Sequence, residues 1–548
     1  MKFSRYIIIV ALAMAVSCTG KFEEMNTNPG AVSEVSPAYV LPSLQESTMH
    51  LSATYGYQTT ENYMLQNYCQ YYANTNAGLA LDRYGYDDTY ALDFWNPYYK
   101  ALKHLKVLKE DLQEHPEYTN IYQMVRIVVA HATIGMTDTF GDLPYFEAAL
   151  ADNQPAYDSQ KDIYYDVFKE LTEASETLAQ NLDGQSACNE DTDLFFAGDI
   201  EKWRKFANSL RLRCALRIVY VDPDKAKSEG EAAMAAGVME SNDDRCYIRV
   251  MATRWGHPLY QVSNWGEFRM SKTMENVLKH TSTVDDPRME LWFGMTANYM
   301  AKNYNNEDIL YKGEKFSGVP NGQTSVSLGE EDADGWIANS IQNNSNIYGL
   351  IAFPDWNQGK STPSATCPVP VKKNMKVMGY PEVCLLKAEA ALRGWQGAGN
   401  AKDNYMEGIR ASFEDERSFV DDRSLCNTAN DELYLTTGDV VWDDAATDLN
   451  VNLKKIATQK WLAVYPYSFE AWAECRRTGF PELMPVYQSD DPDINPANNE
   501  FIRKIRYSDA EWRDNAEHSL DPSLNGGKGD GMAVRVWWDT DDNRSISD

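Results

Sequence analysis

The stretch GYPEVCLLKAEAALRGWQGAGNAKDNYMEGIRASFEDE, residues 379–416, predicts two helices joined by a short turn. Residues 379–394 and 401–416 each carry apolar side chains at helical spacing. The glycine-containing sequence WQGAGN at 395–400 separates them and is typical of a turn. Because a short connection makes consecutive helices neighbours in space, this stretch predicts a helix pair.

The second helix of the pair carries a spacing that is typical of tetratricopeptide repeats. Ala401, Tyr405 and Gly408 follow its small-aromatic-small order. A further helical stretch at 451–483 is interrupted at Pro466, which predicts two more helices. The repetition of helix pairs favours an all-α, mainly α-helical fold with a tetratricopeptide-like scaffold and only a few short strands.

The N-terminal half of the chain shows the same helical periodicity. Ser159 is a candidate N-cap for a helix over residues 160–182. Apolar residues then recur on one stripe of that helix: Ile163, Val167, Leu171 and Leu178. An earlier segment, residues 95–112, has a comparable apolar face: Tyr98, Leu102, Leu105, Leu108 and Leu112. These faces predict helices that pack on a shared core.

Residues 199–220 predict another such helix. One face carries the apolar residues Trp203, Phe206, Ala207, Leu210 and Cys214. The rest of the helix surface is expected to carry Arg211, Arg213 and Arg217. His131 lies within an apolar helical segment, so we interpret it as a core histidine and not as a catalyst or metal ligand.

Changes in composition and in helical periodicity divide the chain into regions. We expect a single domain over residues 41–548, with a helical scaffold at 41–220 and 378–485. Between them, residues 221–377 are rich in Asn, Gly, Ser and Asp with single aromatic residues, a composition typical of long functional loops on a scaffold. Residues 486–548 form a C-terminal tail in which VRVWWD at 534–539 predicts a short strand.

The N-terminus carries a targeting signal. Lys2 and Arg5 precede an apolar run, residues 7–16, that is too short to span a bilayer as a helix. The run ends Ala-Val-Ser-Cys at residues 15–18, which resembles the lipobox of bacterial lipoproteins. We therefore expect residues 1–17 to be removed as a signal peptide, Cys18 to be lipidated, and residues 18–40 to form a tether. Several acyl chains on one residue give stable anchoring, whereas one chain would be marginal.

The charge and the cysteine distribution exclude nucleic acid as a partner and predict no disulfide framework. The chain has 51 Lys and Arg against 81 Asp and Glu, a net charge of −30. Nucleic acid requires a basic surface, so we exclude it as a partner. Eight cysteines follow Cys18, but they are scattered and predict no disulfide framework.

No motif argues for catalysis or for a cofactor. The sequence has no H-E-x-x-H and no G-x-S-x-G, and its seven histidines show no ligand spacing. We expect no catalytic residues, no metal site and no cofactor. Aromatic residues make up 12% of the chain, and in polar loops their flat faces suit stacking on sugar rings or peptide side chains.

The motifs in their order resemble the SusD/RagB-like family of outer-membrane lipoproteins. After Cys18 come FEEMNTNP at 22–29, TDTFGDLPYFEA at 137–148 and the helical segment at 199–218. These are followed by the helix pair at 378–416, the helical segment at 458–483 and the motif IRKIRYSDAEWRDN at 502–515. The resemblance covers nearly the whole mature chain.

This resemblance implies a location, a function and a partner. The protein would sit at the outer membrane and face the exterior, bind nutrient oligomers, most often glycans, and pass them to a SusC-like TonB-dependent transporter. It implies no enzymatic activity. The family motifs describe the scaffold and do not identify the ligand.

Candidate ligand-binding residues follow from aromatic residues in polar loops. Trp203, Trp461 and Trp472 lie in helical patterns, and Trp95 lies at a helix start, so we assign all four to the scaffold. The remaining aromatics would stack on the ligand, and two polar residues beside them would supply hydrogen bonds. The candidates are Arg83, Tyr84, Tyr86, Trp265, Trp336, Asn344, Tyr348 and Trp356. We expect at least two of them to line one external groove.

Three alternatives remain open at this point. The ligand could be a peptide in place of a glycan. The protein could be a surface glycan hydrolase whose paired carboxylates cannot be recognised in sequence. It could also be a purely structural or adhesive surface lipoprotein.

Overall fold

The structure of the chain is a computed structural model. It describes residues 37–51, 53–76, 78–79, 81–149, 154–249, 257–263, 266–305, 314–330, 343–347, 349–352, 355 and 374–540. The described part is mainly helical, as predicted, with four short strands.

The N-terminal helices form the first part of the scaffold. They are α3 (Pro37–Thr48), the π-helix η1 (Ala53–Leu65), α4 (Gln66–Tyr68), α5 (Asp88–Asp111), α6 (Thr119–Phe140), α7 (Gln160–Leu178), α8 (Ile200–Arg217) and α9 (Pro223–Ala236). The first of these begins inside the segment 18–40 that we predicted to be a tether.

The second part of the scaffold and the remaining elements follow later in the chain. The scaffold continues with α14 (Tyr380–Leu392), α15 (Ala401–Arg417), α16 (Asp431–Thr436), α17 (Asn450–Ala463) and α18 (Ser468–Thr478). Between the two parts lie α10 (Pro258–Ser263), α11 (Lys272–His280), α12 (Met289–Trp292) and α13 (Ala297–Tyr304). The tail holds α19 (Asp509–Asp514), α20 (Ala516–Ser519) and α21 (Leu524–Gly527).

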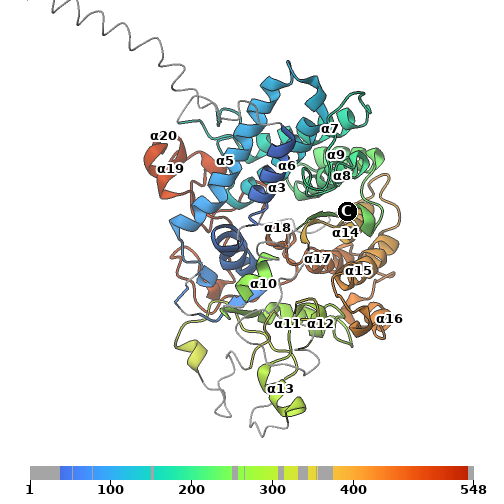
Figure 1. Cartoon of the computed structure of the whole chain (residues 1–548). Coiled ribbons are helices and arrows are strands. Elements are labelled where there is room, and N and C mark those ends of the chain that lie inside the picture. Colours follow the sequence, from blue (N-terminus) through green and yellow to red (C-terminus); the bar gives the residue numbers. More distant parts are fainter. Residues whose placement is uncertain are drawn as a thin grey trace, which may run out of the picture.

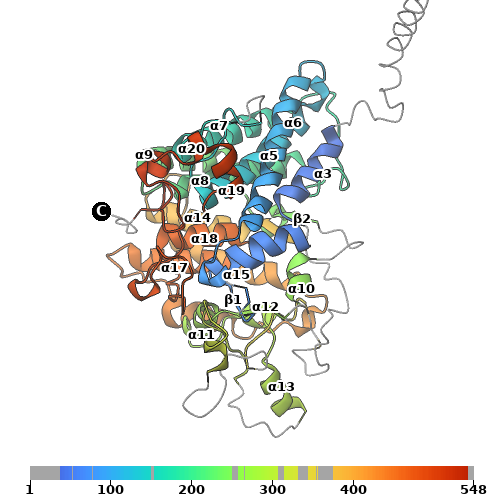
Figure 2. The same cartoon turned by 90° about the vertical axis from the view of Figure 1, so that its left-hand side faces the viewer.

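Consecutive helices of the scaffold pack against each other. The pairs α5 with α6, α6 with α7, α7 with α8, and α8 with α9 are in contact, and so are α14 with α15, α14 with α17, and α17 with α18. Figure 1 shows α3 and α5–α9 in the upper half of the molecule, with α14–α18 beside and below them. Figures 1 and 2 both place α11–α13 at the lower end. The predicted loop region 221–377 also contains α9, which packs against α8 in the scaffold.

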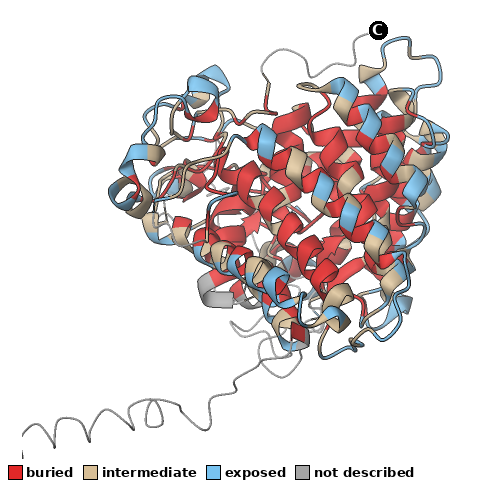
Figure 3. Ribbon diagram, turned by 90° about the horizontal axis from the view of Figure 1, so that it is seen from above, coloured by how far each residue is buried: buried red, intermediate tan, exposed pale blue. Residues whose placement is uncertain are grey.

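Local sequence signals explain where these helices begin and which faces they bury. Ser159 Oγ accepts the Asp162 amide at 3.1 Å, which confirms the predicted N-cap. The whole predicted stripe of α7 is buried: Ile163, Val167, Leu171 and Leu178. In α15, Tyr405 is fully buried and donates its hydroxyl to the Val440 carbonyl at 2.7 Å. Figure 3 shows the result, with buried turns facing inward and exposed turns along the outside.

The predicted apolar face of α8 is buried, but two of its arginines do not lie on the surface as expected. Arg213 and Arg217 are 2% exposed. Arg213 binds Glu382, and Arg217 Nη2 lies 2.5 Å from Glu470 Oε2. The helix is buried on most sides, since α7, α9 and α14 all contact it, and the guanidinium groups are retained there by ion pairs.

The strands are short and stabilise loops and not a large sheet. β1 (Tyr72–Asn74) pairs antiparallel with β3 (Phe268–Met270), and β2 (Cys246–Ile248) pairs antiparallel with β4 (Met375–Met378). The strand predicted at 534–539 is wrong, because this segment has no strand partner in the described chain. The apolar residues Val536 and Trp538 of this segment are buried in the core instead. Trp538 donates Nε1–H to Asp138 at 2.6 Å.

The four tryptophans that we assigned to the scaffold are confirmed as core residues. Trp203, Trp461 and Trp472 are buried in the scaffold, and Trp95 is 7% exposed beside Phe140. Every described cysteine is a free thiol. Within the described residues, no helix combines the length and apolar character needed to cross a bilayer.

Candidate functional site

The candidate site begins with a layer of hydrogen-bonded segments on the loop side of the scaffold. Strand β3 lies in it, because the Met270 amide donates to the Ser345 carbonyl at 2.9 Å and the Met270 carbonyl accepts the Val319 amide at 2.8 Å. The Ser345 amide donates to the Ser317 carbonyl at 2.8 Å. Segments that are far apart in sequence, at 268–270, 317–319 and 343–347, therefore form one surface.

Arg83 joins this layer to the C-terminal tail. It ends the short 3₁₀ helix η2 (Leu81–Arg83). Its Nη1 donates to the Gln323 carbonyl at 3.0 Å, and its Nε lies 3.0 Å from Asp490 Oδ2. The Arg83 carbonyl also accepts the Asp490 amide at 2.6 Å. We call residues 81–83, 321–323 and 487–490 the Arg83 junction.

Asp82 fixes the inner side of the Arg83 junction. Its Oδ2 accepts the amides of Asn74 at 3.1 Å and Gly322 at 3.0 Å. The residue is 1% exposed, and burial raises the pKa of its carboxyl to about 6. Sequence reasoning missed Asp82, Gln323 and Asp490, because their roles come from contacts over more than 200 residues of chain.

Asn344 holds the other end of the same segment. Its Nδ2 donates to the Gly318 carbonyl at 3.2 Å, and the residue is 2% exposed. Arg83 and Asn344 thus bind the backbone of one segment, residues 318–323, at its two ends. Arg83 and Asn344, which we predicted to bind ligand, therefore position segment 318–323 in this structure.

The two predicted tyrosines of the 81–88 loop are already engaged by the protein. Tyr84 has a left-handed backbone, with φ at +64°, and its buried ring lies 5.9 Å from the Tyr68 ring. Tyr86 is half-buried, and the Arg506 guanidinium lies 3.5 Å from its ring centroid. The Tyr86 hydroxyl donates to the Tyr507 carbonyl at 3.2 Å. Tyr84 therefore lies in the core and not in an external groove, and one face of Tyr86 carries a cation.

The remaining candidates lie outside the described residues. They are Trp265, Trp336, Tyr348 and Trp356, together with the lipidation residue Cys18. The chain on both sides of two of them is described: Phe268 is in β3, and Ile347 and Gly349 flank position 348. The described residues nearest in sequence to positions 265 and 348 therefore belong to β3 and its approach and to segment 343–347 of this layer.

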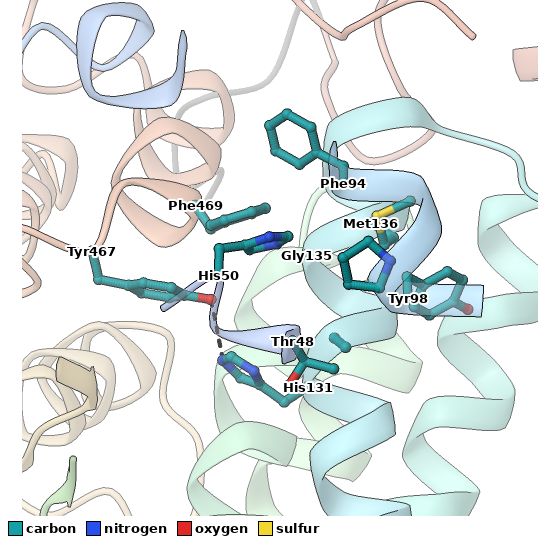
Figure 4. A pocket seen from close by; sticks show the side chains of 11 residues that line it. Thr48, His50, Phe94, Tyr98, His131, Gly135, Met136, Tyr467 and Phe469 are labelled. Carbon is teal, nitrogen blue, oxygen red and sulfur yellow. Dashed lines mark hydrogen bonds between the residues drawn. The ribbon is translucent and has the colours of Figure 1, made fainter. Parts of the chain in front are cut away.

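Two histidines, His50 and His131, line a small cavity within the scaffold (Figure 4). It lies between α3, α5, α6 and α18, and its volume of about 20 Å³ has room for about one water molecule. The Tyr467 hydroxyl and His131 Nε2 are 3.1 Å apart, and the His50 ring stacks on Phe469 at 5.8 Å. Burial lowers the pKa of His50 to about 4 and that of His131 to about 3, so both rings stay neutral. This confirms His131 as a core histidine.

None of the described residues form a group of three or more histidine, cysteine or carboxylate side chains that could hold a metal ion. The described part of the candidate site is a set of polar side chains, Asp82, Arg83 and Asn344, that bind the backbone of loop segments.

Comparison with known proteins identifies the scaffold. The family model described as SusD-like, the SusD and RagB outer membrane lipoproteins, matches residues 24–539. No curated protein matches the chain.

Solved structures match the chain over almost its full length. A chitin-binding SusD homolog from Flavobacterium johnsoniae is 29% identical with a TM-score of 0.71, and the match covers 93% of this chain and 99% of that one. A second structure, described as a chitin-binding protein, is 26% identical with a TM-score of 0.74, and the match covers 92% and 100%. A SusD homolog from Bacteroides ovatus is 27% identical with a TM-score of 0.70, and the match covers 92% and 99%.

Proposed function

Because this chain belongs to the SusD-like family of SusD and RagB outer-membrane lipoproteins, we propose that it captures nutrient glycans outside the cell and delivers them to a SusC-like TonB-dependent transporter. The family consists of binding proteins and not of enzymes, so the surface hydrolase alternative is set aside. The observation that carries the proposal is the family match over residues 24–539 together with two structural relatives that are described as chitin-binding.

A lipid on Cys18 is the proposed anchor. The chain from Cys18 to Pro37, where α3 begins, reaches at most about 65 Å when fully extended. The helical domain is thereby tethered close to the membrane surface, yet has room to swing above the mouth of a transporter. No charged surface is needed for this attachment.

The proposed ligand site combines aromatic side chains with the layer around the Arg83 junction. Trp265, Trp336, Tyr348 and Trp356 would supply stacking faces, and half-buried Tyr86 would border the site. Arg83 and Asn344 would hold segment 318–323 in position beneath the ligand. A rigid base lowers the entropy that is lost when a flexible, well-hydrated glycan binds.

Calorimetry against a panel of oligosaccharides and peptides tests the ligand class. The panel includes chitin, starch and xylan oligosaccharides, together with unrelated peptides of similar size. We expect binding to at least one oligosaccharide and none to peptides. Binding only to peptides would replace the glycan proposal with the peptide alternative.

Co-purification tests the partner. Isolation of the protein from outer membranes in mild detergent at native expression should recover a much larger membrane protein in stoichiometric amount. Recovery of the lipoprotein alone would contradict delivery to a transporter and favour an adhesive or structural role.

A further inference from the structure

A cavity of about 320 Å³ opens beside the candidate site. One wall is the segment 283–291, which runs into α12, and the opposite wall is the turn that precedes α16. Leu350 completes it. Since segment 349–352 follows closely after 343–347 in the chain, the cavity lies next to the layer that Asn344 helps to hold.

The cavity is lined by both apolar and polar residues. Val284, Pro287 and Leu350 supply apolar surface. The polar lining residues include Asp285 and Glu290 from segment 283–291, and Asn427 and Asn430 from the turn before α16. Small-molecule sites have this mixture of apolar surface with a few convergent polar groups, and their volumes begin at about 300 Å³.

Two arginines hold the walls of the cavity in place. Arg288 is fully buried and binds Asp286 through Nε at 2.9 Å and Nη2 at 2.6 Å. On the other wall, Arg417 binds Asp431 through Nη1 at 2.7 Å and Nη2 at 2.6 Å, and its Nη2 donates to the Asn427 carbonyl at 3.1 Å. Paired, bidentate arginines fix both backbone segments, so the cavity is preorganised.

Gly349 brings the third wall into place. The Leu350 amide donates to the Glu290 carbonyl at 2.9 Å, and the Gly349 amide donates to the Trp292 carbonyl at 3.2 Å. A Cβ at position 349 would lie 2.2 Å from the Leu291 carbonyl oxygen, so only glycine permits this approach.

Two polar residues of the lining have hydrogen-bonding capacity that the described protein leaves unused. None of the described residues donates a hydrogen bond to the Asp285 carboxylate, and partial burial raises its pKa. The Asn430 side chain makes no capping bond to α16, although it stands at the N-cap position. Glu290 differs, because it is paired with Lys315 at 2.5 Å. A ligand that offers several hydroxyl or amide donors would satisfy Asp285 and Asn430 together.

We propose that this cavity is a subsite for a single sugar ring of a bound glycan. The ring places its apolar C–H face on Pro287 and Leu350. Its hydroxyl or amide groups donate to Asp285 and exchange hydrogen bonds with Asn427 and Asn430. The inference rests on the proposed function, because it assumes a glycan ligand, and it assigns described residues to ligand binding.

Hydrogen exchange on the full chain locates the subsite. The probes are the oligosaccharides of the calorimetry panel, each added at saturating concentration. We expect slower amide exchange in segments 283–291 and 427–436 with an oligosaccharide that binds. Slower exchange with Ca²⁺ alone, and not with sugar, would overturn the proposal in favour of a cation site.

Substitutions then test the residues. Asp285→Ala and Asn430→Ala should each weaken oligosaccharide binding roughly tenfold, because they remove hydrogen bonds to the ligand. Asn430→Trp should weaken it further by filling the cavity. Asp421→Ala, an exposed carboxylate outside the cavity, is the matched control and should bind as wild type does.

The outcomes separate the two proposals. If an oligosaccharide binds but all three cavity variants retain wild-type affinity and the two segments show no protection, the subsite is wrong and the glycan function stands. If no oligosaccharide of the panel binds, both are overturned. Thermal unfolding of each variant checks that a loss of affinity does not arise from loss of the fold.

Discussion

Arg213 in α8 and Glu382 in α14 form a buried, two-pronged ion pair that joins the two parts of the scaffold. Arg213 Nε and Nη2 each lie 2.7 Å from a carboxylate oxygen of Glu382, and both side chains are 2% exposed. The two residues are 169 positions apart in sequence. Arg213 also pairs with Glu470. Lys460 in turn pairs with both Glu470 and Glu474, so the ion pairs form a connected network.

The first prediction concerns this pair. Arg213→Met should lower the free energy of unfolding by about 3–5 kcal/mol, because it leaves the Glu382 charge buried without its partner. Chemical denaturation measures the loss. Arg410→Met breaks the exposed pair with Glu432 and should cost less than about 1 kcal/mol. The double variant Arg213→Met with Glu382→Leu should recover most of the loss, and failure to do so would refute the unpaired-charge explanation.

The second prediction concerns pH. Glu61 is buried, and desolvation raises the pKa of its carboxyl to about 7, although the Ser468 amide donates to it at 3.1 Å. Because the folded pKa lies above the unfolded value near 4.5, the protonated group favours folding below pH 4.5, and this contribution is lost as the pH rises through 7. Glu61→Gln should therefore match wild type at pH 4.5 and exceed its unfolding free energy by about 2–3 kcal/mol at pH 8.

Denaturation curves at several pH values provide the measurement for Glu61. An exposed control, Glu482→Gln, should show no such dependence on pH, since its side chain is 73% exposed. An equal difference between Glu61→Gln and wild type at pH 4.5 and at pH 8 would contradict the assignment.

The third prediction concerns a close approach within the scaffold. Gly230 in α9 packs on Trp395, and an added Cβ would lie 2.1 Å from Cζ3 of that ring. Gly230→Ala should lower the unfolding free energy by about 1–3 kcal/mol through overpacking, although alanine favours helix. Gly329→Ala meets no atom within 4 Å and serves as the control in the same thermal unfolding experiment. Unchanged stability of Gly230→Ala would show that the helix shifts freely from the indole.

The fourth prediction concerns the aromatic residues of the proposed ligand site. Trp265→Ala, Trp336→Ala and Trp356→Ala are to be compared by calorimetry with an oligosaccharide that binds. At least one of them should weaken binding by more than about 1 kcal/mol, because a few buried aromatics carry most of the energy of an interface. Trp442→Ala removes a half-buried indole whose ring lies 5.4 Å from the buried ring of Tyr405, and it is the control. Wild-type affinity in all three folded variants would exclude this assignment.

The fifth prediction concerns the anchor. Cys18→Ala should move the protein from the outer-membrane fraction to the soluble fraction, because it removes the residue that would carry the lipid. Fractionation and metabolic lipid labelling measure the change, and Cys188→Ala should remain membrane-bound. A Cys18→Ala protein that stays in the membrane at wild-type level would refute the anchor.

Much of the scaffold could be predicted from sequence, because a helix is indicated by the spacing of apolar residues and by capping residues within a short stretch of chain. The cap at Ser159, the buried stripe of α7 and the apolar face of α8 all follow from residues within a few turns of one another. The strand predicted at 534–539 failed for the opposite reason. A strand needs a partner supplied by another part of the chain, and Trp538 packs against the scaffold instead.

The sequence by itself determined the family, the helical class and the buried faces, since these depend on spacing along the chain and on ordered motifs. Tertiary structure decided which polar residues meet. It buried Arg213 against Glu382, turned Tyr84 into the core, and set Arg83 and Asn344 at the two ends of segment 318–323. It also created the cavity between Asp285 and Asn430. These contacts join residues from 16 to 240 positions apart, beyond the few turns over which helical spacing can be read. Hydrogen bonds and ion pairs act only over a few ångströms, so local sequence carries no signal for them.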